Sequence, residues 1–181
     1  VKTLNPKIHG GLLALRDNKK HMEEAKKHGI GLIDMVVVNL YPFEKVTKKE
    51  TTTLEEAIEN IDIGGPSMLR SAAKNYRSVA VVCDPLWYPT IIAELKKTGG
   101  SVSEDVLAKL AVEVFERTST YDSVIHSYLR KRFVSGAQAS PSSITLSFKK
   151  AQDLRYGENP HQKAAFYRDE TIDEPCVSNS I

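Results

Sequence analysis

An asparagine and a tyrosine stand where the most apolar segment of the chain ends. Asn39 and Tyr41 lie at the end of residues 33–40, a run rich in β-branched side chains that is typical of a buried parallel strand. An amide donates and accepts hydrogen bonds, and a tyrosine supplies a phenolic proton. Ligands of parallel α/β sheets bind beyond the carboxyl ends of the strands, so the position predicts a binding site. A loop that only packs an aromatic ring accounts for the same residues equally well.

An aspartate stands between two isoleucines and directly before a turn. Asp62 is followed by Ile63 and then by Gly64-Gly65-Pro66. Apolar neighbours partly desolvate a carboxylate, which suits a general base. Spacing alone nevertheless favours an aspartate that caps the next helix. The two glycines could also offer backbone N–H groups to an anion, although no complete glycine-rich fingerprint accompanies them.

A lysine follows a row of small residues on a predicted helix. Lys74 comes after Ser71-Ala72-Ala73, a face that lets the helix approach another group closely. A lysine in such a place could stabilise or protonate a developing oxyanion. Most lysines are solvated surface charges, which is the simpler interpretation.

The elements that must position these residues alternate along the chain. Strands are predicted at 33–40 and 78–83, and helices at 19–28, 53–60, 67–75, 87–97 and 103–132. This alternation predicts the α/β class, with a mostly parallel sheet and flanking helices in three layers. The small, polar residues 134–143 are the predicted linker. We therefore expect one domain at 1–140, and the linker with the start of a second domain at 141–181.

Composition excludes several classes of protein. The chain has 181 residues, 25 Lys and Arg against 23 Asp and Glu, and 41% hydrophobic residues, as expected of a soluble globular protein. A net charge of +2 provides no strong field for nucleic acid or a membrane surface. Cys83 and Cys176 form no C-x-x-C pair and no histidines have metal-ligand spacing, so neither a disulfide framework nor a metal site is predicted. The cysteine usage fits the cytosol, and the start at Val1 rather than Met indicates a piece of a longer protein.

Five segments together resemble one family of enzymes. They are residues 1–11 (VKTLNPKIHGG), 39–43 (NLYPF), 61–66 (IDIGGP), 69–75 (LRSAAKN) and 154–162 (LRYGENPHQ). In this order they resemble a family of multifunctional enzymes in purine biosynthesis. Its bifunctional members combine AICAR transformylase with IMP cyclohydrolase. Residues 1 to about 140 look like the later part of the cyclohydrolase domain, whose fold is similar to methylglyoxal synthase. The last segment looks like the beginning of the transformylase domain.

The resemblance implies both a hydrolase and a transferase activity. The cyclohydrolase closes the ring of formyl-AICAR to IMP with loss of water and no cofactor, and the transformylase formylates AICAR from 10-formyltetrahydrofolate. Matching active-site positions are Lys2, Tyr41, Asp62 and Lys74, with Lys74 as proton donor or acceptor. Matching nucleotide contacts are Val1, Lys2, Thr3, Val38, Asn39, Asp62 and Ile63, and the matching AICAR contacts are Arg155 and Tyr156. The complete protein is expected to be a cytosolic homodimer.

Two departures from the family pattern affect this reading. Asn5 stands where the family usually has the His of KTLHP, which keeps hydrogen bonding but loses a titratable group. The family's glycine-rich phosphate loops precede Val1, and its transformylase Lys-His pair follows Ile181. We therefore expect both active sites to be incomplete in these 181 residues.

Two other classes of function are alternatives. The first is a non-catalytic, methylglyoxal-synthase-like domain that binds a phosphorylated metabolite; such a domain needs a phosphate cradle, but not Tyr41, Asp62 and Lys74 together. The second is an RNA-binding module built on Arg130-Lys131-Arg132. This is a single short basic cluster without an aromatic platform, so it is the weaker alternative.

Overall fold

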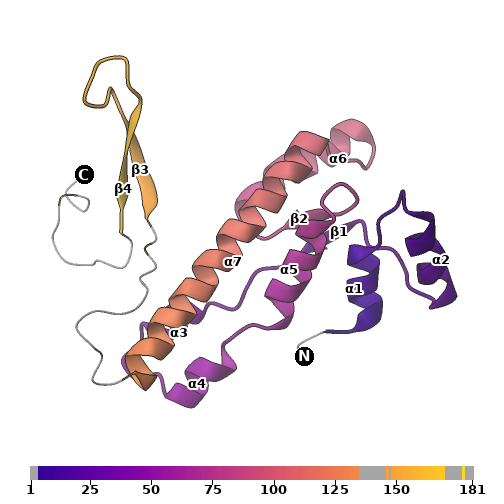
Figure 1. Ribbon diagram of the computed structural model, residues 1–181, viewed down its shortest axis with the longest axis horizontal. Helices are drawn as coiled ribbons and strands as arrows, with labels where there is room; N and C mark the ends of the chain where they lie inside the picture. The colour runs from indigo at the N-terminus through magenta and orange to yellow at the C-terminus, as the bar shows by residue number, and fades with distance from the viewer. Residues whose placement is uncertain (1–3, 135–145, 147, 170–176, 178–181) are drawn as a thin grey trace. The chain divides into compact units, whose positions relative to one another are not determined.

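The computed structural model describes residues 4–134, 146, 148–169 and 177, which belong to two compact units (Figure 1). Unit 1 covers residues 1–135 and unit 2 covers 136–181. The described elements of unit 1 are α1 (Pro6–Leu13), α2 (Lys19–Lys27), β1 (Met35–Val37), α3 (Phe43–Thr47), α4 (Leu54–Glu59), α5 (Gly64–Lys74), β2 (Ala80–Val82), the 3-10 helix η1 (Pro85–Trp87), α6 (Tyr88–Thr98) and α7 (Glu104–Phe133). Those of unit 2 are β3 (Lys149–Leu154) and β4 (Ala164–Arg168).

Strands β1 and β2 pair in parallel, which confirms the predicted α/β class. Val36 lies opposite Val81, and the backbone N–H of Val38 continues the pairing by donating to the carbonyl of Val82 at 3.0 Å. Both strands lie inside the predicted segments 33–40 and 78–83 but are shorter. Within the part of the chain that the structure describes, unit 1 has these two strands, and helices join and cover them.

The core of unit 1 lies where α5 and α7 meet β2. The two helices run side by side in Figure 1 and both pack against the strand. Apolar residues are spaced three and four apart on these helices. Leu69 from α5, and Leu110 and Val114 from α7, are buried in one cluster with Val81. Burial of each such side chain stabilises the fold by about 1.5–3 kcal/mol. This core fixes the exits of both strands, where the chemistry was predicted.

Side-chain caps begin helices α2 and α4. The Asn18 side chain accepts from the N–H of His21 at 3.2 Å to begin α2, and the Thr53 hydroxyl accepts from the N–H of Glu56 at 3.1 Å to begin α4. Asparagine and threonine are residue types that favour this position, and both helices lie within the predicted segments 19–28 and 53–60. Helix α5 begins at Gly64, three residues before the predicted start at Ser67, because Pro66 is accommodated in the first turn.

Helix α1 was not predicted, and it gives Asn5 a role. The Asn5 side chain accepts from the N–H of Lys7 at 2.9 Å, and Pro6 occupies the first helical position. The residue that replaces the family's usual histidine is therefore an N-cap. An asparagine is among the best residues for this purpose, so the substitution keeps the helix start intact.

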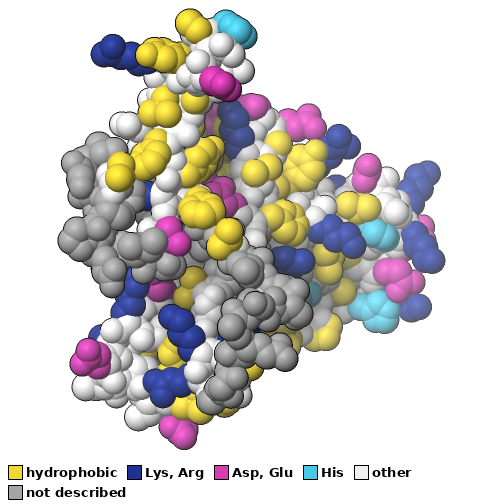
Figure 2. All heavy atoms as spheres, turned by 60° about the vertical axis from the view of Figure 1, so that its left-hand side comes forward, with side chains coloured by type: hydrophobic (Ala, Val, Ile, Leu, Met, Phe, Trp, Pro, Cys, Tyr) yellow, Lys and Arg dark blue, Asp and Glu magenta, His cyan; other side chains and the backbone are white. Residues whose placement is uncertain are grey.

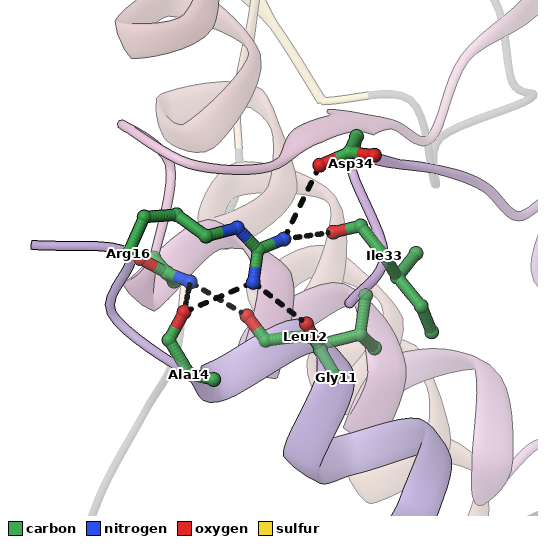
Figure 3. A network of polar contacts seen from close by, with 7 residues as sticks. Gly11, Leu12, Ala14, Arg16, Ile33 and Asp34 are labelled. Carbon is green, nitrogen blue, oxygen red and sulfur yellow. Dashed lines mark hydrogen bonds and ion pairs between the residues drawn. The ribbon is translucent and has the colours of Figure 1, made fainter. Parts of the chain in front are cut away.

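Arg16 joins the end of α1 to the entry of β1 (Figure 3). Its guanidinium donates to the carbonyls of Gly11, Ala14 and Ile33 at 3.5, 3.2 and 2.8 Å, and pairs with the Asp34 carboxylate at 3.4 Å. The carbonyls at a helix C-terminus lack partners within the helix. The Arg16 side chain thus supplies donors to carbonyls at the end of α1 and also holds the start of the strand that leads to Asn39 and Tyr41.

Charged side chains of both signs lie on the face drawn in Figure 2. On the face in Figure 2, Lys and Arg side chains are interspersed with Asp and Glu rather than gathered into one patch. Among the described helices, none has an apolar stretch long enough to cross a membrane.

Candidate functional site

The exits of β1 and β2 border a pocket with a volume of about 300 Å³. Its lining includes Asn39 and Tyr41 from the segment after β1, Cys83 after β2, and Arg117 and Tyr121 from α7. This is the carboxyl edge of the parallel pair, where ligands of such sheets bind. Tyr41 is 40% exposed, so its phenol is accessible.

Asp62 links the segment after β1 to the start of α5. Its side chain is 8% exposed; Oδ1 accepts from the N–H of Gly65 at 2.9 Å and Oδ2 accepts from the N–H of Tyr41 at 3.4 Å. The first contact is that of a helix-capping aspartate, one residue before Ile63 at the N-cap position. Asp62 adjoins Tyr41 in this way, but it does not line the pocket.

Gly65 is required by the closeness of this carboxylate. A Cβ atom at position 65 would lie 2.4 Å from Asp62 Oδ2 and 3.0 Å from Leu40 Cδ2. Both distances are shorter than normal contacts, so only glycine fits without displacing Asp62. The N–H of Gly65, which was considered as a donor to an anion, already binds Asp62.

Tyr121 on α7 lines the same pocket and was not among the predicted site residues. Its hydroxyl accepts from the N–H of Asp62 at 2.9 Å and lies 3.3 Å from the carbonyl of Asn60, to which it donates. Burial raises the pKa of Tyr121, so the hydroxyl keeps its proton in the neutral range. The contact joins residues that are 59 positions apart in the sequence, so no local motif predicts it.

Three further predicted nucleotide contacts, Val38, Asn39 and Ile63, lie close to Tyr41 and Asp62 in the chain. The Asn39 amide donates to the Tyr88 hydroxyl at 3.3 Å, and Val38 is half-buried beside β2. Ile63 is exposed at the start of α5. Val38, Asn39, Tyr41, Asp62 and Ile63 therefore gather around the exit of β1 and the start of α5.

Lys74 lies elsewhere on α5. It is exposed in the last turn, and the 11 residues of the helix separate it from the Asp62 end by about 15 Å. Among the described residues, Lys74 is therefore not part of the pocket lining. Val1, Lys2 and Thr3 lie outside the described residues, as do most of the predicted linker 134–143 and the boundary after residue 140.

Unit 2 presents Arg155 and Tyr156 on an antiparallel hairpin. Both side chains are exposed in the connection between β3 and β4. Gln162 closes this connection: its side-chain Oε1 accepts from the N–H of Asn159 at 2.9 Å, and its carbonyl accepts from the N–H of Gly157 at 3.0 Å. Residues 154–162 were predicted as a motif, but neither strand of the hairpin was predicted.

Two family models match the chain. The one described as "AICARFT/IMPCHase bienzyme" covers residues 72–180, and the "MGS-like domain" covers residues 2–67. These matches agree with the order of segments on which the resemblance was based.

Curated relatives and one solved structure extend the comparison. The chain is 55% identical over 168 residues to the "Bifunctional purine biosynthesis protein PurH" of Thermoanaerobacter sp. (strain X514), covering 93% of this chain and 32% of that protein. It is 58% identical over 168 residues to the protein of the same name from Magnetococcus marinus, covering 92% and 32%. The crystal structure of ForH matches with a TM-score of 0.62 and 31% identity, covering 76% of this chain and 69% of that one.

The chain spans about a third of the length of these curated relatives, whereas the bienzyme model alone matches more than half of the chain. The resemblance found in the motifs is confirmed, and this chain belongs to the AICARFT/IMPCHase bienzyme family.

Proposed function

We propose that the protein containing this chain closes the ring of formyl-AICAR to IMP at the carboxyl edge of β1 and β2. Family membership supports the reaction. The location is supported by the hydrogen bond from the Tyr41 N–H to Asp62, because both residues match active-site positions of the family and lie beside the pocket.

Ring closure requires proton transfer and stabilisation of an oxyanion. The carboxamide nitrogen attacks the formyl carbon and forms the new C–N bond; the formyl oxygen then leaves as water, carrying one proton from each of the two reacting nitrogens. These steps need groups that accept and donate protons next to the formyl oxygen. In the proposal, Tyr41, Asp62 and Lys2 supply them at this edge, and Val1, Thr3, Val38, Asn39 and Ile63 contact the nucleotide. Lys74 is exposed at the other end of α5, so its proposed role as proton donor or acceptor rests on the family match alone.

The proposal extends to the second reaction of the family. Arg155 and Tyr156 hold AICAR, and 10-formyltetrahydrofolate donates the formyl group. The preformed hairpin supports this assignment, because Gln162 fixes the connection that carries both side chains. In the complete protein we place the cyclohydrolase part at 1–140 and the linker with the start of the transformylase at 141–181. A cytosolic homodimer is part of the same proposal.

The experiment is an assay of both half-reactions with the purified full-length protein. IMP formation from formyl-AICAR is followed by absorbance, and formylation of AICAR is followed separately with 10-formyltetrahydrofolate. We expect both activities. Full-length protein that is folded but forms no IMP would contradict the cyclohydrolase proposal.

A non-catalytic domain for a phosphorylated metabolite is the second candidate function. It is favoured by the match of residues 2–67 to the MGS-like domain. Calorimetric binding of a nucleotide monophosphate without any ring closure would support it over the enzyme.

A further inference from the structure

We propose that Tyr121 is a positioning residue for ring closure, which acts by holding the backbone at Asp62 through its hydroxyl group. The inference rests on the proposed cyclohydrolase function, since it assigns Asp62 to that site. It adds a residue on α7, outside the five motif segments that carried the family resemblance.

The hydroxyl of Tyr121 bridges the connection between two helices. Helix α4 ends at Glu59 and α5 begins at Gly64. Across this gap, the oxygen of Tyr121 accepts from the N–H of Asp62 at 2.9 Å and donates to the carbonyl of Asn60 at 3.3 Å. The hydroxyl therefore uses both its donor and its acceptor capacity to fix this short connection to the long helix α7.

The side chain of Asp62 transmits this restraint to the loop after β1. With its backbone fixed, the carboxylate receives the N–H groups of Gly65 and Tyr41. The ring of Tyr121 also packs edge-on against Phe43, with centroids 6.4 Å apart, and Phe43 is 1% exposed. Tyr121 thus contacts Asp62 through its hydroxyl and the Tyr41–Phe43 loop through its ring. Reacting groups displaced by about 1 Å can lose roughly 100-fold in rate, so such a tether has consequences for turnover.

A second tyrosine on α7 provides the matched comparison. Tyr128 also packs edge-on against Phe43, with centroids 5.5 Å apart. Its buried hydroxyl has no hydrogen-bond partner among the residues that the structure describes. Tyr128→Phe therefore removes a hydroxyl from the same helix and the same aromatic cluster without breaking the tether to Asp62.

The test is a mutant cycle in the full-length protein, assayed for IMP formation well below the lowest unfolding midpoint of the set. The variants are Tyr121→Phe, Asp62→Asn, the double variant, and Tyr128→Phe. We expect Tyr121→Phe to lower kcat by about 10- to 100-fold and Tyr128→Phe to stay within about twofold of wild type. In the Asp62→Asn background, Tyr121→Phe should cause little further loss, because residues that act through one group are not additive.

Hydrogen exchange supplies a readout that is independent of activity. Tyr121→Phe should accelerate amide exchange of Asp62 by about 10-fold or more, whereas Tyr128→Phe should leave it unchanged. An active wild-type protein in which Tyr121→Phe leaves kcat unchanged would overturn the assignment. Equal losses in the wild-type and Asp62→Asn backgrounds would also overturn it, since they indicate a general structural effect. A folded wild-type protein without ring closure would instead overturn the proposed function on which the assignment rests.

Discussion

The backbone N–H of Tyr41 donates to Oδ2 of Asp62 at 3.4 Å, although the two residues are 21 positions apart. The other carboxylate oxygen accepts from the N–H of Gly65 at 2.9 Å. One side chain therefore connects the loop after β1 to the first turn of α5. Changes that displace this carboxylate should affect both segments at once.

Gly65→Ala tests the space around the carboxylate. The new methyl group would lie 2.4 Å from Asp62 Oδ2, so the side chain must move and lose its contacts. We expect the free energy of unfolding to fall by about 1–3 kcal/mol, as measured by urea denaturation. Gly31→Ala is the control, because nothing lies within 4 Å of a Cβ atom at position 31. Equal effects of the two substitutions would contradict this explanation.

Asn75→Ala tests how α1 is held against α5. The Asn75 amide is buried and donates to the carbonyls of Leu12 and Ala14 at 2.8 and 3.1 Å. Removing these donors should lower the free energy of unfolding by about 1–3 kcal/mol. Asn60→Ala is the control, because Asn60 is also a C-cap whose amide donates to a carbonyl. Its residue is only half-buried and the hydrogen bond is exposed, so water can replace the lost donor. A loss for Asn60→Ala as large as that for Asn75→Ala would count against burial as the cause.

Cys83 gives a pH-dependent prediction. It is 4% exposed, and burial raises the pKa of its thiol from 9.0 to about 11. Between these values the unfolded chain releases the proton and the folded chain keeps it. The stability that Cys83 contributes is therefore complete below about pH 9 and is lost as the pH rises toward 11.

The measurement for Cys83 is the free energy of unfolding of the wild type minus that of Cys83→Ala, as a function of pH. We expect this difference to decrease with a slope of at most roughly 1.4 kcal/mol per pH unit above pH 9. The subtraction removes the titration of lysines and tyrosines shared by both proteins. A difference that stays constant up to pH 10 or rises would be inconsistent with a buried, protonated thiol.

Lys74→Ala, made in the full-length protein, tests the proposed role of this lysine. Charge develops on the formyl oxygen only as nitrogen attacks, so a lysine that serves this oxygen acts mainly in the transition state. We expect turnover to fall by about 100- to 1,000-fold with little change in IMP binding. Lys96→Ala is the control, since Lys96 is another exposed lysine in the last turn of a helix. Turnover within a few-fold of wild type would make Lys74 an ordinary surface lysine, as its position at the far end of α5 allows.

Local features of the fold could be predicted, and features made by distant residues could not. The caps at Asn18 and Thr53 and the parallel strands depend on short segments with clear patterns. Helix α1 also has a local signal, Asn5-Pro6, but Gly10 and Gly11 lower its helix propensity, so packing against α5 decides its conformation.

The candidate site shows the same division. Asn39 and Tyr41 could be located because they follow a strand, and Asp62 because it precedes a helix. The contact between Asp62 and Tyr121 joins residues on α7 and before α5, and neither residue type nor spacing reveals it. The hairpin of β3 and β4 was missed because all side chains of β3 are exposed, which removes the apolar alternation of a half-buried strand.

Asp62→Asn in the full-length protein tests whether ring closure and formylation use separate sites. We propose ring closure at Asp62 in unit 1 and AICAR binding at Arg155 and Tyr156 in unit 2. We therefore expect Asp62→Asn to lower IMP formation from formyl-AICAR by about 100-fold or more, while formylation of AICAR stays within about twofold of wild type. Unchanged IMP formation in a folded variant, or an equal loss of both activities, would contradict ring closure at Asp62.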